Sequence, residues 1–390
     1  MTANRTSYKI ACFAVFYSYF LIPLLFIAFN SLDLGIIRQI SDLGLFLLLL
    51  IKLFFILLSD NKYIDEYGYK LFVALALFII IAFFRFAIPL VSYDDLNLIA
   101  GAMEFKLVFY VLVALILFLN VKESLAPIVV KYAMVLAIIL IFDFLVLGFS
   151  AGSLQRATST GEVNYEAFLL VISICILLSQ QALNKKQLML IIMGLLVSMS
   201  RTGIISVLVI FLLSNKISIT YKIVFSSLAL FFIGASFVVR ELDYFSIEGI
   251  ERYWMWSMAV EMFSHDPIGL LIGFNPYAPL PVGDIPPQLS WLSSHQIEGK
   301  GWNGFYPFSF HSMWLRIFSI WGIGGFILLG ALFYGIFSRK VDPFKRNISI
   351  VIILQGMTMG VFYIGYLSVI TILLILNIKS TNVEYSKGIK

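Results

Sequence analysis

The sequence predicts an all-helical protein that crosses a membrane many times. Of its 390 residues, 61% are hydrophobic and only 13% are charged, and the mean hydropathy is +0.98. A water-soluble domain of this length could not hide so much apolar surface, because the buried fraction rises only slowly with chain length. A bilayer can cover it, since a helix of about 20 apolar residues is long enough to cross the hydrocarbon core. We therefore expect an all-α, polytopic integral membrane protein.

Polar breaks divide the chain into apolar runs, which predict about twelve transmembrane helices. The expected runs are 10–29, 42–58, 69–90, 105–120, 128–149, 165–183, 187–200, 202–214, 222–239, 312–337, 347–363 and 364–378. The seventh and eighth runs are short and meet at Ser200-Arg201. Residues 350–378 fit either one long tilted helix or a tight hairpin at Gly360 to Gly365.

The distribution of Lys and Arg predicts the orientation, because cytoplasmic loops are enriched in both residues. With the N-terminus placed in the cytosol, the inner segments hold 17 of the 27 Lys and Arg residues and the outer segments hold 8. The remaining two, Lys52 and Arg85, fall within expected helices. An even number of helices returns the C-terminus to the cytosol. The basic residues form no patch, so we expect no nucleic-acid partner.

One polar segment differs from the rest of the chain. Residues 240–311 form an expected outer loop that carries all three histidines and seven of the eleven prolines. All six tryptophans lie between Trp254 and Trp321. Loops of this length are uncommon unless they are functional, although Trp also favours membrane interfaces. The sequence thus divides into helices over 1–239, the large loop over 240–311, and helices with a cytoplasmic tail over 312–390.

Two arginines outside the helix centres are candidates for binding an anion. Arg201 lies between two short apolar runs, where an arginine near hydrocarbon is a functional candidate. Its planar fork of donors suits a bidentate contact with phosphate. The alternative is a turn that lets the guanidinium reach the membrane surface. Arg156, followed by Asn164 and a helix, is either a second candidate or a solvated loop arginine.

The large loop is expected to contain a short helix from Glu251 to Phe263. Helical spacing places Arg252, Trp256, Ala259 and Phe263 on one face. Asp266-Pro267 and the glycines at 269 and 273 end this helix. Either this face presents Arg252 to a ligand, or it packs against the rest of the protein with the charge of Arg252 at the edge of the contact.

His311 directly precedes an apolar run and is expected at the outer start of a helix. Histidine titrates near neutral pH and can accept a proton from a hydroxyl group. A structural role at the helix start is the alternative. His265 and His295 have no comparable position.

Signals for metal or cofactor chemistry are weak. Asp94-Asp95 is an acidic pair in an outer loop, but adjacent aspartates alone say little. The sequence contains no P-loop, no G-x-S-x-G motif and no histidine pair at metal-binding spacing. Cys12 and Cys175 lie within apolar runs and are expected to pack as small hydrophobic residues. We expect no metal and no cofactor.

The sequence resembles the O-antigen polymerase and ligase superfamily of bacterial envelope enzymes, because short motifs follow one another in that family's order. They are Arg156, Gly161 and Asn164 before a helix; Ser200 to Gly203 at the end of a short helix; Arg252 and Trp256 opening the long loop; Pro267 to Phe274; and His311, Leu315, Gly322 and Gly325 at the loop's end. Many relatives have Asn after the histidine, where this chain has Ser312. The motifs cover roughly 150–330, and the resemblance in topology extends over the whole chain.

The resemblance implies a metal-independent glycosyltransferase in the bacterial inner membrane, with its active site facing the periplasm. The donor would be an oligosaccharide on undecaprenyl diphosphate. Arg201, Arg252 and Arg156 would bind the lipid diphosphate, and His311 would be the catalytic residue. Trp256 and Asn164 would contact the glycan.

Within this superfamily the abundance of Phe, at 37 residues, favours the polymerase. A polymerase joins two lipid-linked glycans, and its expected protein partners are a chain-length regulator and a flippase. The alternative within the superfamily is the ligase, which transfers the glycan to lipid A core. A polysaccharide transporter or flippase is the alternative from another class, which would be expected to show interrupted helices in matching halves.

Overall fold

The computed structural model describes residues 2–28, 34–57, 66–92, 96–150, 163–239, 251–289, 304–337 and 343–378. Every longer regular element in these ranges is a helix, and the described residues contain no strand, which confirms the all-α class. The longer helices are α1 (Thr2–Phe16), α2 (Ile22–Ala28), α3 (Leu34–Leu57), α4 (Glu66–Ser92), α5 (Leu98–Phe118), α6 (Ala126–Ser150), α7 (Val163–Ser179), α8 (Lys185–Val197), α9 (Arg201–Leu213), α10 (Ile219–Val239), α11 (Glu251–His265), α12 (Pro267–Ile272), α14 (Met313–Phe337), α15 (Pro343–Gly356) and α16 (Gly365–Asn377). Short turns of helix are η1 (Tyr17–Leu21), η3 (Pro287–Leu289), η5 (Pro307–Ser309) and η6 (Val361–Tyr363).

Each expected apolar run contains a helix. The first run forms α1, the π-helical turn η1 and α2 in succession. The seventh and eighth runs form the separate helices α8 and α9. Residues 350–378 form two helices, α15 and α16, with η6 between them, so the interpretation as one long helix is wrong.

Five of the described helical segments are long and apolar enough to cross a membrane. They are Arg5–Ala28, Ile36–Leu57, Leu98–Phe118, Ala126–Val146 and Ile219–Phe237. Five further apolar helical segments are shorter, between 10 and 17 residues. The fold therefore has the composition expected of a helical membrane protein.

Several helices begin earlier than the apolar runs indicate. Helix α3 starts at Leu34 and α5 at Leu98, so Arg38 and Glu104 lie on helices. The turns that precede the apolar runs carry charged residues with partners elsewhere in the bundle. Arg38 Nη2 donates to the Tyr165 hydroxyl at 2.9 Å, and Glu104 Oε1 lies 2.8 Å from Arg316 Nη2. Hydropathy alone misses such turns because their polar side chains are paired within the protein.

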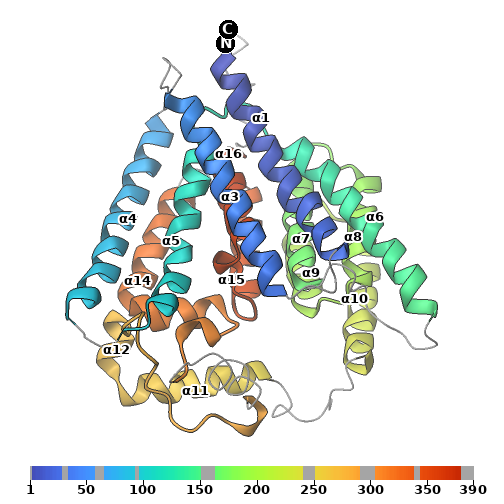
Figure 1. Ribbon diagram of the computed structural model, residues 1–390. Helices are drawn as coiled ribbons and strands as arrows, with labels where there is room; N and C mark the ends of the chain where they lie inside the picture. Colours follow the sequence, from blue (N-terminus) through green and yellow to red (C-terminus); the bar gives the residue numbers. More distant parts are fainter. Residues whose placement is uncertain are drawn as a thin grey trace.

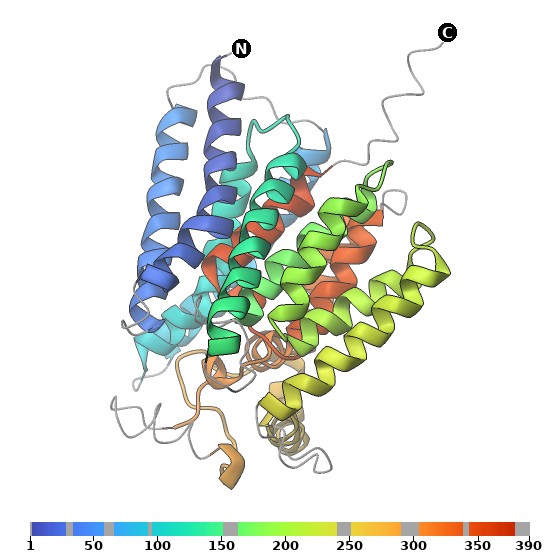
Figure 2. The ribbon, with the colours of Figure 1, turned by 90° about the vertical axis from the view of Figure 1, so that its right-hand side faces the viewer.

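The helices form one bundle with a distinct loop side (Figure 1). The start of α1 and the end of α16 lie at one end of the bundle, and α11 and α12 lie at the opposite end. Helix α11 crosses beneath the bundle, because it appears lengthwise in Figure 1 and end-on in Figure 2. We call the end that carries α11 and α12 the loop side.

The bundle is most deeply buried around α7. Nearly every side chain of α7 from Val163 to Leu178 is buried, and the helix packs against α6, α8, α9 and α15. Helix α16, packed against α5 and α3, is buried to a similar degree. By contrast, α3, α4 and α10 expose large apolar side chains on the outside, as a lipid-facing wall does.

Candidate functional site

Helix α11 contacts the end of α15 through the face predicted from its sequence. Arg252 Nε donates to the carbonyl oxygen of Thr358 at 3.3 Å, and Trp256 Nε1 donates to that of Met357 at 3.3 Å. The adjoining side of the helix buries Met255 and Met258 in a second hydrophobic cluster, to which Ala259 of the predicted face also belongs. The predicted helix is confirmed and extends to His265. Arg252 is therefore held at the point where α15 ends.

A close contact between two glycines joins α12 to α14. Gly273 has φ 81° and Gly322 has φ 60°, a region that favours glycine. A Cβ at Gly273 would lie 2.0 Å from the carbonyl oxygen of Ile320. Arg85 of α4 donates to that same oxygen at 2.8 Å and also to the carbonyl oxygen of Phe274. These contacts fix the kink of α14 at Gly322. They also explain why both positions are glycine, because neither has room for a Cβ atom.

A buried ion pair fixes the first turn of α14. Arg316 Nη2 lies 2.8 Å from Glu104 Oε1 of α5, and the Arg316 guanidinium lies 3.5 Å from the ring centroid of Tyr363. Sequence reasoning did not select Glu104 or Tyr363. A carboxylate directly before an apolar run was the available signal for Glu104, since acidic residues in transmembrane helices are usually functional or paired.

His311 lies between η5 and α14, two residues before the helix starts, as its sequence position predicted. Its side chain is half-buried. Burial, with the positive charges of Arg252, Arg38 and Arg316, lowers the pKa of His311 from 6.5 to about 4. The imidazole is therefore neutral at pH 7 and can accept a proton.

Arg38 links α3 to the start of α7. Its Nη2 donates to the hydroxyl of Tyr165 at 2.9 Å. The ring of Tyr165 meets that of Tyr366, at the start of α16, in an edge contact with centroids 6.4 Å apart. Because Tyr165 follows Asn164 directly, this contact joins α3 to the turn of α7 that carries one of the predicted glycan-binding residues.

Asn164 and Ser200 meet where α7 and α9 begin. The hydroxyl of Ser200 donates to Asn164 Oδ1 at 2.9 Å. The turn between α8 and α9 is tight, with Met199 at φ 50°. Arg201, the first residue of α9, lies with its guanidinium 4.6 Å from the ring centroid of Phe237 on α10. The two motifs around Asn164 and Arg201 thus form one local structure.

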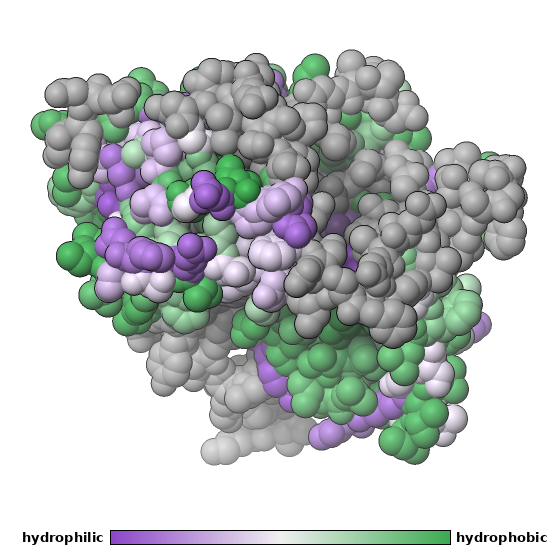
Figure 3. All heavy atoms as spheres, turned by 90° about the horizontal axis from the view of Figure 1, so that it is seen from below, coloured by the Kyte–Doolittle hydropathy of each residue, from purple (hydrophilic) through white to green (hydrophobic). Residues whose placement is uncertain are grey.

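The structure brings the sequence-selected residues together as two groups on the loop side. His311 and Arg252 form one group, and Asn164 and Arg201 belong to the other. Helix α15 connects the groups, since it packs against α9 and its end contacts Arg252. Seen from the loop side, hydrophilic side chains gather in one area of this face and hydrophobic ones in another (Figure 3).

Other sequence-selected residues have different positions. Arg156, Asp94-Asp95 and His295 lie outside the described residues. His265 ends α11, where its Nδ1 lies 2.8 Å from the carbonyl oxygen of Glu261. Among the described residues, no group of three or more His, Cys, Asp or Glu side chains could hold a metal ion.

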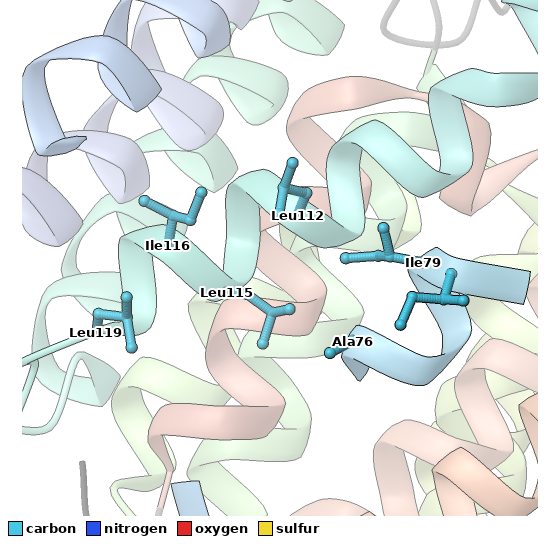
Figure 4. Close-up of a pocket in the computed structure, with 7 residues that line it drawn as sticks. Ala76, Ile79, Leu112, Leu115, Ile116 and Leu119 are labelled. Atoms are coloured by element: carbon cyan, nitrogen blue, oxygen red, sulfur yellow. The ribbon is translucent and has the colours of Figure 1, made fainter. Parts of the chain in front are cut away.

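An apolar hollow lies apart from these groups. Its volume is roughly 240 Å³, and α4 and α5 line it (Figure 4). Leu112, Leu115 and Ile116 of α5, with Leu119 just after it, contribute to the lining and lie eight or more residues beyond Glu104, toward the end where the chain termini lie. At about 1.5 Å per residue, the hollow is more than about 10 Å from the ion pair.

The fold and these polar groups are those of an all-helical membrane protein whose arginines, histidine and buried ion pair lie at one end of its bundle. Comparison with models of known protein families gives no match, and a search of curated proteins finds no similar sequence.

Proposed function

We propose that this protein is an O-antigen polymerase, a metal-independent glycosyltransferase that joins undecaprenyl-diphosphate-linked repeat units at the periplasmic face of the bacterial inner membrane. All twelve helical runs cross the membrane in this proposal, and the loop side faces the periplasm. The observation that carries it is the position of His311 at the entry to α14, where Arg252, Arg38 and Arg316 lie close enough for their positive charges to act on the imidazole.

The reaction needs a proton acceptor near the attacking hydroxyl and positive charge near the leaving diphosphate. A hydroxyl of the acceptor glycan attacks the anomeric carbon of the donor sugar, and the bond from that carbon to the diphosphate oxygen breaks. A lone pair of the hydroxyl oxygen forms the new glycosidic bond. Undecaprenyl diphosphate leaves with the electrons of the broken bond, and the hydroxyl proton passes to His311. Donors placed where negative charge develops stabilise such a transition state.

The arginines supply that charge. In this proposal Arg201 and Arg252, together with Arg156, bind the diphosphate, since a guanidinium can bind two phosphate oxygens at once. Asn164 and Trp256 contact the sugars. The hydrogen bond from Ser200 to Asn164 supports this grouping, because it joins the two motifs that carry Asn164 and Arg201.

The direction of the helical hairpins favours an enzyme over a transporter. Transporters built from inverted repeats place matching interrupted helices with opposite orientations. Here the turn between α8 and α9 contacts the start of α7, and the end of α15 contacts Ser312 at the start of α14, with Ser312 Oγ donating to the carbonyl oxygen of Gly356 at 3.0 Å. Both turns lie on the loop side.

Deletion of the gene in its source bacterium, followed by gel analysis of the surface polysaccharide, tests the proposal. We expect lipid A core that carries a single repeat unit, because ligation continues while polymerisation stops. Core without any repeat unit would identify the ligase. A normal ladder of chain lengths would exclude both activities.

A further inference from the structure

Helix α12 presents an uncovered apolar face. Its sequence, Pro267 to Ile272, contains no charged residue, and Asp266 caps it by accepting from the Gly269 N–H at 2.9 Å. The side chains of Ile268, Leu271 and Ile272 are 68%, 56% and 63% exposed. Positions three and four apart share one side of a helix, so these three side chains form one face.

The segment after α12 is attached to the loop-side end of α4. The Tyr277 hydroxyl donates to the carbonyl oxygen of Phe86 at 3.0 Å, and Arg85 donates to that of Phe274. Gly273 packs against α14 with no room for a side chain. These contacts leave α12 little freedom to move relative to α4.

The end of α4 also exposes apolar side chains. Ile88 is 59% exposed and Val91 is 90% exposed, and they continue the apolar wall of α4 past Arg85. At the start of the adjacent helix α5, Leu98 and Ile99 are 62% and 63% exposed. Helix α4 has 27 residues, about 40 Å at 1.5 Å per residue, so its last turns reach the edge of a hydrocarbon core about 30 Å thick.

We propose that α12 is an interfacial helix whose apolar face, Ile268, Leu271 and Ile272, inserts into the lipid leaflet on the loop side. The occupant of this face is the acyl chains of the bilayer, because the face continues the lipid-facing wall at the end of α4. Short apolar faces of this kind bury about 5–10 Å into the headgroup and acyl boundary. The proposal depends on the helices crossing a membrane and not on the proposed enzymatic function.

Insertion of α12 would set the depth of α11. Only Asp266 separates the two helices, so the C-terminal end of α11 would be held by an anchor at the membrane surface. Arg252 and Trp256 on α11 would then be held close to the level of lipid phosphates. The anchor thus explains how a polar segment stays near the membrane.

Depth-dependent fluorescence quenching tests the insertion. A bimane label is placed at Leu271→Cys, and separately at Ile268→Cys, in a chain with Cys12 and Cys175 replaced by alanine. The full-length protein is reconstituted in nanodiscs with one chain per disc and with lipids that carry a nitroxide near the top of the acyl chain. We expect strong quenching by the lipid at both positions and weak quenching by aqueous iodide.

Two labelled positions serve as matched controls. Phe84→Cys reports the lipid-facing wall of α4, since Phe84 is 56% exposed, and Asp284→Cys reports the exposed polar loop. Lipid quenching at 271 equal to that at 284 would overturn the proposal. Protection at 271 from both quenchers would also overturn it, because a single chain in the disc would then cover the face with protein.

Discussion

Arg316 of α14 and Glu104 of α5 form an ion pair with 2.8 Å between Nη2 and Oε1, and both side chains are buried. The two residues are far apart in sequence, so this pair holds together two distant parts of the chain. His311 lies five residues before Arg316, at the entry to the same helix. The pair therefore determines where the proposed catalytic histidine stands.

Replacement of Glu104 by Gln should strongly destabilise the protein. The Arg316 charge would remain buried without its carboxylate, and breaking a buried pair typically costs about 3–5 kcal/mol. We expect a clearly lower Tm for the purified protein in detergent, together with loss of polymer. Lys106→Met is the matched control, because Lys106 pairs with Asp42 at a side-chain exposure of 38%. An exposed pair contributes about 0.2–1 kcal/mol, so equal Tm values for the two variants would contradict the role given to Glu104.

Arg201→Lys and Arg252→Lys should each abolish most polymer formation at normal protein levels. A lysine keeps the charge but has no planar fork for two phosphate oxygens. The measurement is polymer length and amount from purified protein supplied with lipid-linked repeat units. Arg5→Lys, in α1 at the opposite end of the bundle, is the control and should behave as wild type. Wild-type polymer from both site variants would refute the assignment of the diphosphate site.

The loop side should face the periplasm, and both chain termini should face the cytosol. The excess of Lys and Arg in the expected inner segments is the reason. An alkaline phosphatase fusion at Asp284 should be active, because the enzyme folds only after export from the cytosol. A stable but inactive fusion there, with an active fusion at the C-terminus, would reverse the orientation.

Much of the fold is predictable from the sequence because lipid imposes long apolar runs. The runs locate the helices, although α3 and α5 begin several residues before their runs, and helical spacing identifies α11 with Arg252 and Trp256 on one face. The ion pair between Glu104 and Arg316 is not predictable, since nothing local indicates which helix faces which. The same holds for Arg38, whose contact with Tyr165 joins α3 to α7. Gly273 and Gly322 were visible as motif glycines, but only the packing of α12 on α14 explains them.

His311 should control the pH dependence of polymerisation. The reaction needs neutral imidazole, and burial with three nearby arginines lowers the pKa of His311 to about 4. Activity governed by kcat/KM reports the free enzyme. It should therefore stay level as pH falls from 7 to about 5, then drop as the histidine takes up a proton near its pKa of about 4. An ordinary histidine would instead cause a drop near pH 6.5.

Bound substrate should shift the acid limb of the pH–activity profile to higher pH. The diphosphate brings negative charge close to His311 and offsets the arginines, which favours the protonated imidazole and raises its pKa. The acid limb of kcat, which reports the complex, should accordingly lie at higher pH than that of kcat/KM. A higher pKa in the complex also makes His311 a better proton acceptor at neutral pH. Identical limbs for both parameters would argue against charge coupling between the diphosphate and His311.

Substitution of His311 separates proton transfer from positioning. A positioned base contributes about 10²–10⁴-fold in rate, so His311→Ala and His311→Gln should both lose at least about 10²-fold in kcat while the protein stays folded. Gln keeps a hydrogen-bonding group but cannot take a proton at neutral pH. His265→Ala is the control, because His265 ends α11 and is not part of the group around Arg252. If His311→Gln kept a near-normal turnover rate with purified lipid-linked substrate, the histidine would only orient the acceptor hydroxyl. Stabilisation of the leaving diphosphate by the arginines would then account for most of the catalysis, and the proton would leave to water or phosphate.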